Sequence, residues 1–369
     1  MYQPQVGNSL DTLDTPAMIV DLDLMEGNIA RLMARFRELN VHVRPHLKTV
    51  KSPDLARILL RAGASGGCVA KVSEAEVMAQ AGIEDLLITS EIVGKPKVAR
   101  LVALLREHRR IKSVVDSFAG AQALNEAMRE AGLTLDVLLD LNVGQNRTGV
   151  RPGEEALTLA RQIGNMSNLR LIGVQGYEGH LQHVHDAEER AARCRQAMQL
   201  LTAMAAQLRT EGFPIEIVTT GGTGTGEICA TCQGVTEVQP GSFIFMDTDY
   251  RNAIGPVYAN ALTILSTVIS RAPERAVVDA GLKSLSIDSG MPEAKSLPGV
   301  RYRPGGDEHG VLTWDENITL PPDALSIGDR IEFIPSHIDT TINLHDTYYA
   351  YRDGKIVAIW PVSARGKVQ

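Results

Sequence analysis

Two periodicities of apolar residues alternate along roughly the first 250 residues of the chain. Short, mostly apolar runs are typical of buried strands, and most are followed by a longer stretch with apolar residues three or four positions apart, which is typical of an amphipathic helix. In residues 24–39, for example, Ile29, Leu32, Met33 and Phe36 share one helical face. The strand-like runs are residues 41–48, 67–72, 85–89, 111–116, 135–142, 169–177, 215–220 and 238–246. Eight such runs, separated by helices, predict a TIM-like (β/α)8 barrel.

The pattern changes after about residue 250. The remaining β-type segments are broken by Pro and Gly turns and have no comparable helical stretch between them; they are residues 261–271, 276–282, 311–314, 330–335 and 348–362. We therefore predict a barrel of residues 20–250 followed by a C-terminal all-β domain of residues 251–369, which residues 1–19 are expected to join. An open doubly wound sheet would carry a Gly-rich fingerprint after its first strand, and the sequence has none there.

Composition and charge restrict the partners and the location. Of 369 residues, 44% are hydrophobic and 22% are charged, which is typical of a globular protein with an ordinary core. The net charge of −7 argues against binding to nucleic acid or to an anionic membrane surface. No apolar run approaches the roughly 20 residues of a membrane span, and residues 1–16 show no signal-peptide pattern. The expected location is the cytoplasm.

The cysteines predict neither a disulfide framework nor a zinc site. There are four, Cys68, Cys194, Cys229 and Cys232, which are too few for a disulfide framework. Cys229 and Cys232 have the CxxC spacing of redox and zinc sites, but a structural zinc needs a second ligand pair, which the sequence lacks. We interpret these two residues as thiols near a loop.

Reactive groups in a parallel barrel lie at the carboxyl ends of its strands, and two stretches there are unusual. Lys48 ends the run at residues 41–48, where an amine that loses solvation can attack a carbonyl; the alternative is a solvated loop lysine. Residues 219–226 consist of four Gly and four Thr just beyond another strand. Their backbone amides can hold a phosphate, although a flexible turn is the alternative. Together, a lysine and a phosphate loop predict pyridoxal 5′-phosphate.

Other candidate residues lie near further strand ends. Arg147 and Tyr177 are candidates for contact with the cofactor ring, with a surface salt bridge as the alternative for Arg147. His183, in a segment with three histidines, is the candidate general base. In the β domain, His337 and Asp339 are spaced to share one face of a strand, and an imidazole with a carboxylate suits Mg²⁺ or Mn²⁺. A simple His–Asp hydrogen bond is the alternative for this pair.

Several motifs resemble one known family. They are RPHLKT from Arg44, DLNVGQNRTG from Asp140, GYEGHLQH from Gly176, TTGGTGTG from Thr219 and PSHIDTTINLHD from Pro335. In this order, and over nearly the whole chain, they resemble the D-threonine aldolase and D-serine dehydratase group. These are pyridoxal-phosphate enzymes with an alanine-racemase-like barrel and a C-terminal β domain.

The resemblance implies a role for each candidate. Lys48 would carry the cofactor as a Schiff base, and Arg147 and Tyr177 would lie near its ring. Phosphate contacts would come from the loop residues Thr220, Gly222, Thr223 and Gly224. His183 would be the base, and His337 with Asp339 would bind a divalent metal, Mn²⁺ or Mg²⁺. The dehydratases typically have a cysteine where this chain has Asp339, which favours an aldolase.

The predicted function is therefore that of a lyase. It would use pyridoxal phosphate and a divalent metal to cleave a small β-hydroxy-D-amino acid, D-threonine-like, into glycine and an aldehyde by a retro-aldol reaction. One alternative is dehydration of D-serine or D-3-hydroxyaspartate to a 2-oxo acid and ammonia. A more distant one is a pyridoxal-phosphate-binding protein without catalysis. The resemblance also implies a homodimer, with active sites between the barrel of one subunit and the β domain of the other.

Overall fold

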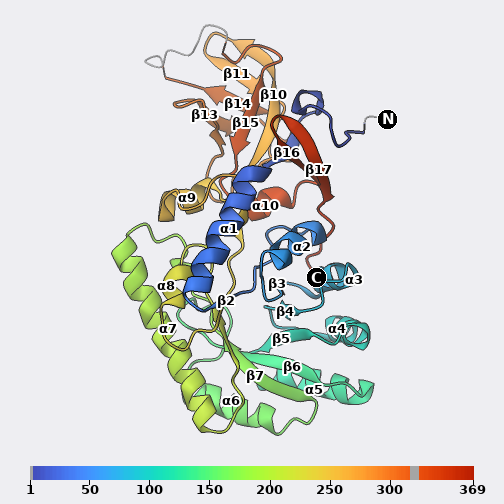
Figure 1. Ribbon diagram of the computed structural model, residues 1–369, viewed down its shortest axis with the longest axis vertical. Helices are drawn as coiled ribbons and strands as arrows, with labels where there is room; N and C mark the ends of the chain where they lie inside the picture. Colours follow the sequence, from blue (N-terminus) through green and yellow to red (C-terminus); the bar gives the residue numbers. More distant parts are fainter. Residues whose placement is uncertain (1–2, 316–323) are drawn as a thin grey trace. The chain divides into compact units, whose positions relative to one another are not determined.

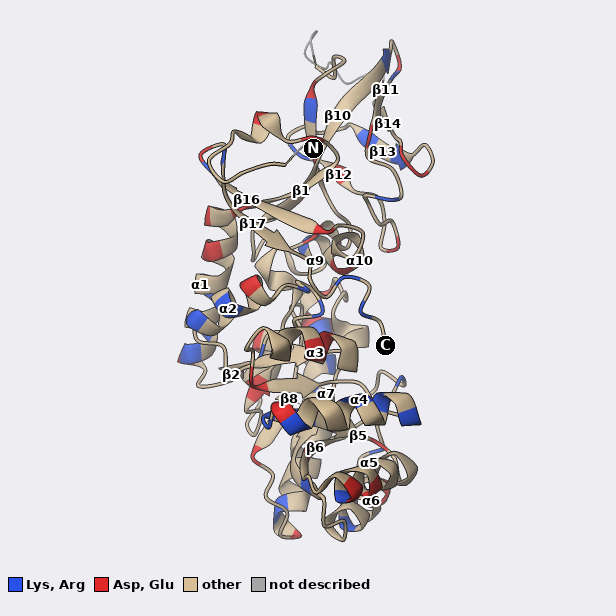
Figure 2. Ribbon diagram, turned by 90° about the vertical axis from the view of Figure 1, so that its right-hand side faces the viewer, with Lys and Arg blue, Asp and Glu red and all other residues tan. Residues whose placement is uncertain are grey.

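The computed structural model describes residues 3–315 and 324–369. The chain divides into two compact units. The barrel unit comprises residues 30–241 and 366–369, and the β unit comprises residues 1–29 and 242–365. None of the described helices is long and apolar enough to cross a membrane. Basic and acidic side chains occur on both units, with neither sign confined to one of them (Figure 2).

The barrel unit is built on eight parallel strands. They are β2 (His42–Val43), β3 (Gly67–Val69), β4 (Leu86–Ile88), β5 (Ile111–Val115), β6 (Leu135–Asp140), β7 (Leu169–Gln175), β8 (Ile217–Thr220) and β9 (Glu237–Val238). Their order is β2-β9-β8-β7-β6-β5-β4-β3, and a bridge between His46 and Cys68 joins the two ends of this order. One buried cluster takes a side chain from each of five consecutive strands: Cys68, Leu87, Val114, Leu138 and Ile172. The predicted (β/α)8 fold is confirmed.

Helices follow most of these strands (Figure 1). They are α2 (Pro53–Arg61), α3 (Val72–Gln80), α4 (Lys95–Glu107), α5 (Phe118–Ala131), α6 (Glu154–Gly164), α7 (Ala187–Thr210) and α8 (Gly226–Ala230), with α1 (Leu22–Glu38) ahead of β2. Helix α5 shows how local sequence determines where a helix begins, where it ends and which face it buries. Its N-cap Ser117 accepts a hydrogen bond from the Gly120 amide, and its C-cap Gly132 has a φ of 67°. Leu124 and Met128 bury its apolar face.

All eight strands of the barrel are shorter than the predicted runs, and two of them, β2 and β9, fall furthest short. β2 ends at Val43, and residues 47–50 form a turn instead of the end of a strand. β9 ends at Val238, and a 3-10 helix at Ser242–Ile244 replaces the rest of the predicted strand 238–246. In both places a proline, Pro45 or Pro240, follows the strand. Proline lacks the amide proton that a central strand donates to its neighbour, so the strand ends there.

The β unit contains a nine-stranded sheet. Its strands are β1 (Ala17–Asp21), β10 (Leu262–Ala272), β11 (Arg275–Val278), β12 (Glu293–Ala294), β13 (Arg301–Pro304), β14 (Gly310–Thr313), β15 (Arg330–Ile334), β16 (Thr347–Arg352) and β17 (Lys355–Pro361). A further pairing of β10 with β11 closes part of the sheet into a small antiparallel barrel. β1 pairs antiparallel with β10 and parallel with β16. The predicted β architecture is confirmed, with short helices α9 (Thr248–Ile254) and α10 (Ile338–Ile342) added.

One β-type segment of the sequence is a hairpin. The stretch 348–362 is divided into β16 and β17 by Asp353 and Gly354, which have φ of 49° and 69°. An Asp-Gly pair adopts the left-handed backbone of a tight hairpin turn with little strain, so these two residues set the reversal.

Candidate active site

Lys48 lies on an ordered turn. Leu47 is buried against Gly67, and its amide donates to the Cys68 carbonyl at 2.7 Å. Thr49 and Val50 are buried as well, whereas the Lys48 side chain is exposed. Because its neighbours on both sides are fixed in the barrel, the turn directs the amine of Lys48 outward, where a carbonyl compound can reach it.

A second lysine in the same turn has a structural role. Lys51, with a φ of 48°, is 8% exposed, and its Nζ lies 2.7 Å from Glu74 Oε1. The other oxygen of Glu74 accepts hydrogen bonds from the amides of Ala70 and Lys71 at 2.7 and 3.3 Å. This buried ion pair joins the turn to the start of α3. Of the two lysines, only Lys48 presents an accessible amine.

His46 marks the point where Lys48 and Arg147 come together. Burial and the two cations, Lys48 and Arg147, lower the pKa of His46 well below its usual value. The Lys48 amide donates to Nδ1 at 3.4 Å, so the neutral ring carries its proton on Nε2, which lies 3.0 Å from the Thr89 hydroxyl. The ends of β2, β4 and the loop after β6 therefore meet around a neutral imidazole.

Arg147 lies against Tyr177. The centre of its guanidinium is 5.5 Å from the Tyr177 ring centroid. Its loop is held by Asn142, whose side-chain oxygen accepts from the amides of Gly144 and Asn146 at 3.0 and 3.1 Å. The Gly149 amide donates to Asp116 Oδ2 at 3.2 Å. The structure thus places Arg147, in a fixed loop, against Tyr177, and the charges of Lys48 and Arg147 both act on His46.

A pair of carboxyl groups lies at the same rim. Burial, followed by the proximity of Asp140, raises the pKa of Glu91 from its usual 4.5 to about 7. Burial also raises the pKa of Asp140, whose carboxylate accepts from Gln175 Nε2 at 2.9 Å and from the Thr148 hydroxyl at 3.0 Å. The pair therefore retains a proton to near neutral pH. The sequence shows both residues near strand ends but gives no sign that their side chains meet.

The glycine- and threonine-rich loop follows β8 and is tightly packed. The Gly222 amide donates to Thr225 Oγ1 at 3.2 Å, and the Gly224 amide donates to Gln182 Oε1 at 2.9 Å. A Cβ at Gly224 would overlap the Gln182 carbonyl. These glycines allow the loop to pack against residues 178–182, which is a requirement that the sequence does not show.

His183 lies in the turn after the 3-10 helix Gly179–Leu181, and its side chain is exposed. Nearby His180 contacts the Arg147 loop: a Cβ on Gly144 would lie 3.2 Å from its Cε1. Burial and Arg193 lower the pKa of His180. The predicted base is thus on the β7–α7 connection that also carries Tyr177.

His337 and Asp339 do not lie on a strand, contrary to the prediction. His337 is the N-cap of α10, and Asp339 is in its first turn. The chain leaves the sheet after Ile334, and the Ile338 amide donates to Asp247 Oδ2 at 3.2 Å, which favours the start of a helix. The two side chains still converge, with His337 Nε2 3.7 Å from Asp339 Oδ2.

A third carboxylate orients this histidine. Asp288 Oδ2 lies 2.7 Å from His337 Nδ1, on the side of the ring away from Nε2. Burial opposes protonation, but Asp339, Asp288 and Asp247 outweigh it and raise the pKa of His337. Among residues 3–315 and 324–369, no group of three or more His, Cys, Asp or Glu side chains is arranged to hold a metal. The pair supplies one nitrogen and one carboxylate ligand, a set that suits Mg²⁺ or Mn²⁺ with water completing the shell.

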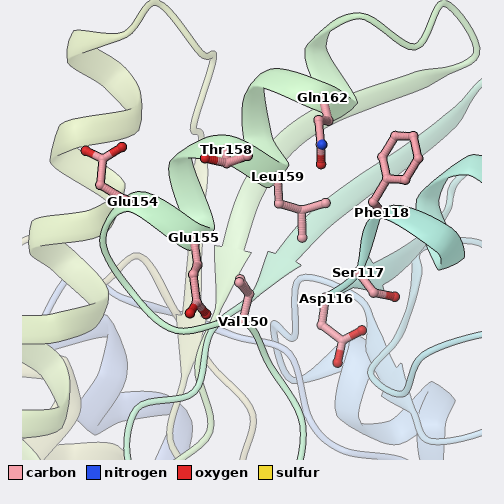
Figure 3. A pocket seen from close by; sticks show the side chains of 9 residues that line it. All are labelled: Asp116, Ser117, Phe118, Val150, Glu154, Glu155, Thr158, Leu159 and Gln162. Carbon is pink, nitrogen blue, oxygen red and sulfur yellow. The ribbon is translucent and has the colours of Figure 1, made fainter.

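A hollow of about 390 Å³ opens between α5 and α6 (Figure 3). Its lining includes the carboxylates of Asp116, Glu154 and Glu155 together with the apolar Phe118 and Leu159. None of its nine lining residues is Lys or Arg. An acidic hollow without a cation does not suit an anionic cofactor, so the candidate site remains the rim around Lys48.

Comparison with known proteins identifies the family. Residues 20–249 match the family model described as alanine racemase, N-terminal domain, and residues 261–351 match the putative serine dehydratase domain. The chain belongs to the alanine-racemase-like family in which this barrel is followed by a D-serine-dehydratase-type domain. The family predicted from the sequence motifs is confirmed.

Aldolases are among the most similar relatives. The chain is 39% identical over 366 residues to a D-threonine aldolase from Arthrobacter sp, covering 98% of this chain and 95% of that protein. The crystal structure of D-threonine aldolase from Filomicrobium marinum superposes with a TM-score of 0.94 at 41% identity, covering 99% and 100% of the two chains. D-threo-3-hydroxyaspartate dehydratase from Delftia sp. HT23 has a TM-score of 0.86 at 31% identity, covering 96% and 98%.

Proposed function

We propose that this protein is a lyase that cleaves a β-hydroxy-D-amino acid, D-threonine-like, between Cα and Cβ to give glycine and an aldehyde. The observation that carries the proposal is the similarity to D-threonine aldolases over both units of the chain. Asp339 supports it, because the sequence motif has a carboxylate where the dehydratases typically have a cysteine. The barrel, predicted as residues 20–250, would bind the cofactor, and the β domain, residues 251–369, would bind the metal.

Membership of the family implies pyridoxal 5′-phosphate, and the rim around Lys48 fits this cofactor. The exposed amine of Lys48 would hold its aldehyde covalently. Arg147 and Tyr177 would lie beside the ring, and Thr220, Gly222, Thr223 and Gly224 would contact the phosphate. When bound, the cofactor supplies an electron sink for the pair of electrons left on Cα after bond cleavage.

The protein's own residues would then accept one proton and bind one metal ion. His183 would take the proton from the β-hydroxyl of the substrate as the Cα–Cβ bond breaks, and protonation of Cα would then complete glycine. His337 Nε2 and the Asp339 carboxylate would hold Mn²⁺ or Mg²⁺, an ion that favours ionisation of a hydroxyl next to it. Asp288, on Nδ1 of His337, leaves Nε2 of that ring available to the ion.

Dehydration is the second candidate, because the dehydratase from Delftia sp. HT23 shares the fold over nearly the whole chain. That reaction begins with loss of the Cα proton, continues with loss of the β-hydroxyl, and ends with hydrolysis of the resulting imine to a 2-oxo acid and ammonia. One assay separates the candidates: incubation with D-threonine, D-allo-threonine, D-3-hydroxyaspartate and D-serine, followed by analysis of the products. Glycine with an aldehyde is expected. A 2-oxo acid with ammonia would establish the dehydratase, and bound cofactor without either product would indicate a protein that binds it without catalysis.

A further inference from the structure

One buried carboxylate, Glu178, lies beneath the loop assigned to the phosphate. It is 0% exposed. Its Oε1 accepts from the Thr225 hydroxyl at 2.5 Å and from Gln182 Nε2 at 3.2 Å. Its Oε2 lies 2.8 Å from the Thr220 hydroxyl and 3.4 Å from the Gly221 amide. All four partners are neutral groups, and three of them belong to the loop.

This carboxylate fixes the direction of the surrounding hydrogen bonds. The Thr225 hydroxyl has a single proton, and it donates this proton to Glu178 Oε1. The Thr225 oxygen then accepts from the Gly222 amide at 3.2 Å and from Gln182 Nε2 at 2.7 Å. With its amide nitrogen directed to these two groups, Gln182 presents Oε1 to the Gly224 amide at 2.9 Å. Glu178 therefore determines that the Gly222 and Gly224 amides find acceptors, Thr225 Oγ1 and Gln182 Oε1, on the neighbouring side chains.

Packing makes this arrangement tight. A Cβ at Gly222 would lie 2.6 Å from Gln182 Oε1, which leaves no room for a side chain. The contacts join residues 42 to 47 positions apart in the sequence, and all of the residues belong to the barrel unit. The loop backbone is thus held from one side by the segment 178–182.

We propose that Glu178 is a positioning residue for the cofactor phosphate. Through Thr225 and Gln182 it holds residues 221–224 in the conformation that receives the phosphate group. The inference rests on the proposed function, because it takes pyridoxal phosphate as the ligand of this loop. It predicts that the effect of Glu178 depends on the phosphate of the ligand and not on its ring or aldehyde.

The test compares two ligands on the full chain freed of cofactor. Dissociation constants for pyridoxal 5′-phosphate and for pyridoxal, which lacks the phosphate, are measured for the native protein and for Glu178→Gln. Glutamine has the same shape as glutamate, but its amide nitrogen is a donor. It would face the hydroxyl and N–H groups that donate to Glu178 in the native protein. Affinity for pyridoxal phosphate should fall by about tenfold or more, the effect of one buried polar mismatch. Affinity for pyridoxal should change by less than about twofold, because it makes no phosphate contact.

Two further variants keep the test decisive. Gln182→Ala removes the acceptor at the Gly224 amide and should show the same selective loss, even if Glu178→Gln does not fold. Leu124→Ala, in the buried face of α5, is the control: it should lower the melting temperature but leave the ratio of the two affinities at its native value.

Three results would overturn the inference. Equal losses for both ligands, or no loss for either, would show that Glu178 does not act through the phosphate. Tighter binding of pyridoxal phosphate by Gln182→Ala would show that Gln182 competes with the phosphate. If the native protein itself does not distinguish the two ligands, the assignment of the loop to the phosphate fails, and with it that part of the proposed function.

Discussion

Two lysines that lie close together in the chain have different environments. Lys48 is exposed, whereas Lys51 is buried with Glu74. Borohydride reduction of the protein with bound cofactor, followed by peptide mapping, should place the pyridoxyl group on Lys48. A label on Lys51 or Lys71 would disprove the assignment.

The two lysines should also differ in their effects on stability. Without cofactor, Lys48→Ala should change the free energy of unfolding by no more than about 0.5 kcal/mol, as for a typical surface substitution. Lys51→Ala leaves the buried carboxylate of Glu74 without its cation, and should cost about 3 to 5 kcal/mol. Denaturant unfolding of the two variants measures the difference. Equal losses would contradict the assignment of separate roles to the two lysines.

Glu91 should make stability depend on pH. Above about pH 4.5 the unfolded chain loses this proton, whereas the folded protein keeps it to about pH 7. The folded state therefore binds more protons across this range, and this group's contribution to stability falls as the pH rises. Glu91→Gln should raise the melting temperature relative to the native protein more at pH 8 than at pH 5.

The control for this prediction is Glu130→Gln, which changes an exposed glutamate. Scanning calorimetry of the three proteins at both pH values gives the comparison. If Glu91→Gln shifts the melting temperature equally at pH 5 and pH 8, the proton is not held by this pair.

At the scale of elements, the sequence predicts the barrel well because the relevant forces are local. Buried parallel strands need apolar runs, and covering helices need one apolar face, so both leave a periodic pattern. The ends of elements are less visible. β9 stops before Pro240, and α10 starts at Ile338, where a distant carboxylate, Asp247, accepts a hydrogen bond from the backbone amide.

The sequence predicts some residues of the candidate site but gives no indication of others. Lys48, Arg147 and Tyr177 belong to motifs; the structure packs Arg147 against Tyr177, and the charges of Lys48 and Arg147 both act on His46. Glu178 and Asp288 gave no local signal, because their partners lie far along the chain: Thr225 is 47 residues from Glu178, and His337 is 49 residues from Asp288. Residues that hold a site in place are identified by their contacts, which only the folded chain shows.

His337 and Asp339, at the start of α10, are the predicted metal ligands. Chelation should abolish carbon–carbon cleavage while the visible absorbance of bound cofactor remains, because the ion acts on the β-hydroxyl and not on the attachment to Lys48. Asp339→Ala should have the same effect, since one protein ligand cannot hold a hard cation tightly. Asp346→Ala, which removes an exposed carboxylate of the same unit, should leave cleavage unchanged.

A purely structural ion would give a different pattern. Removing it would lower the melting temperature and the cofactor content together. Cleavage, cofactor absorbance and melting temperature are therefore measured on one chelated sample. Undiminished cleavage by metal-free protein would contradict a catalytic role of the ion.

At the scale of the whole molecule, the account predicts a homodimer. The resemblance to enzymes whose sites lie between the barrel of one subunit and the β domain of the other implies this assembly. Light scattering at assay concentration should give twice the mass of one 39.9 kDa chain. A mass near that of a single chain would contradict the prediction.

The proposed function depends on cleavage of the bond between Cα and Cβ. The most direct measurement is the balance of products from D-threonine in the presence of pyridoxal phosphate and Mn²⁺. We expect one glycine and one acetaldehyde for each D-threonine consumed. Formation of 2-oxobutanoate and ammonia, with no glycine, would contradict it.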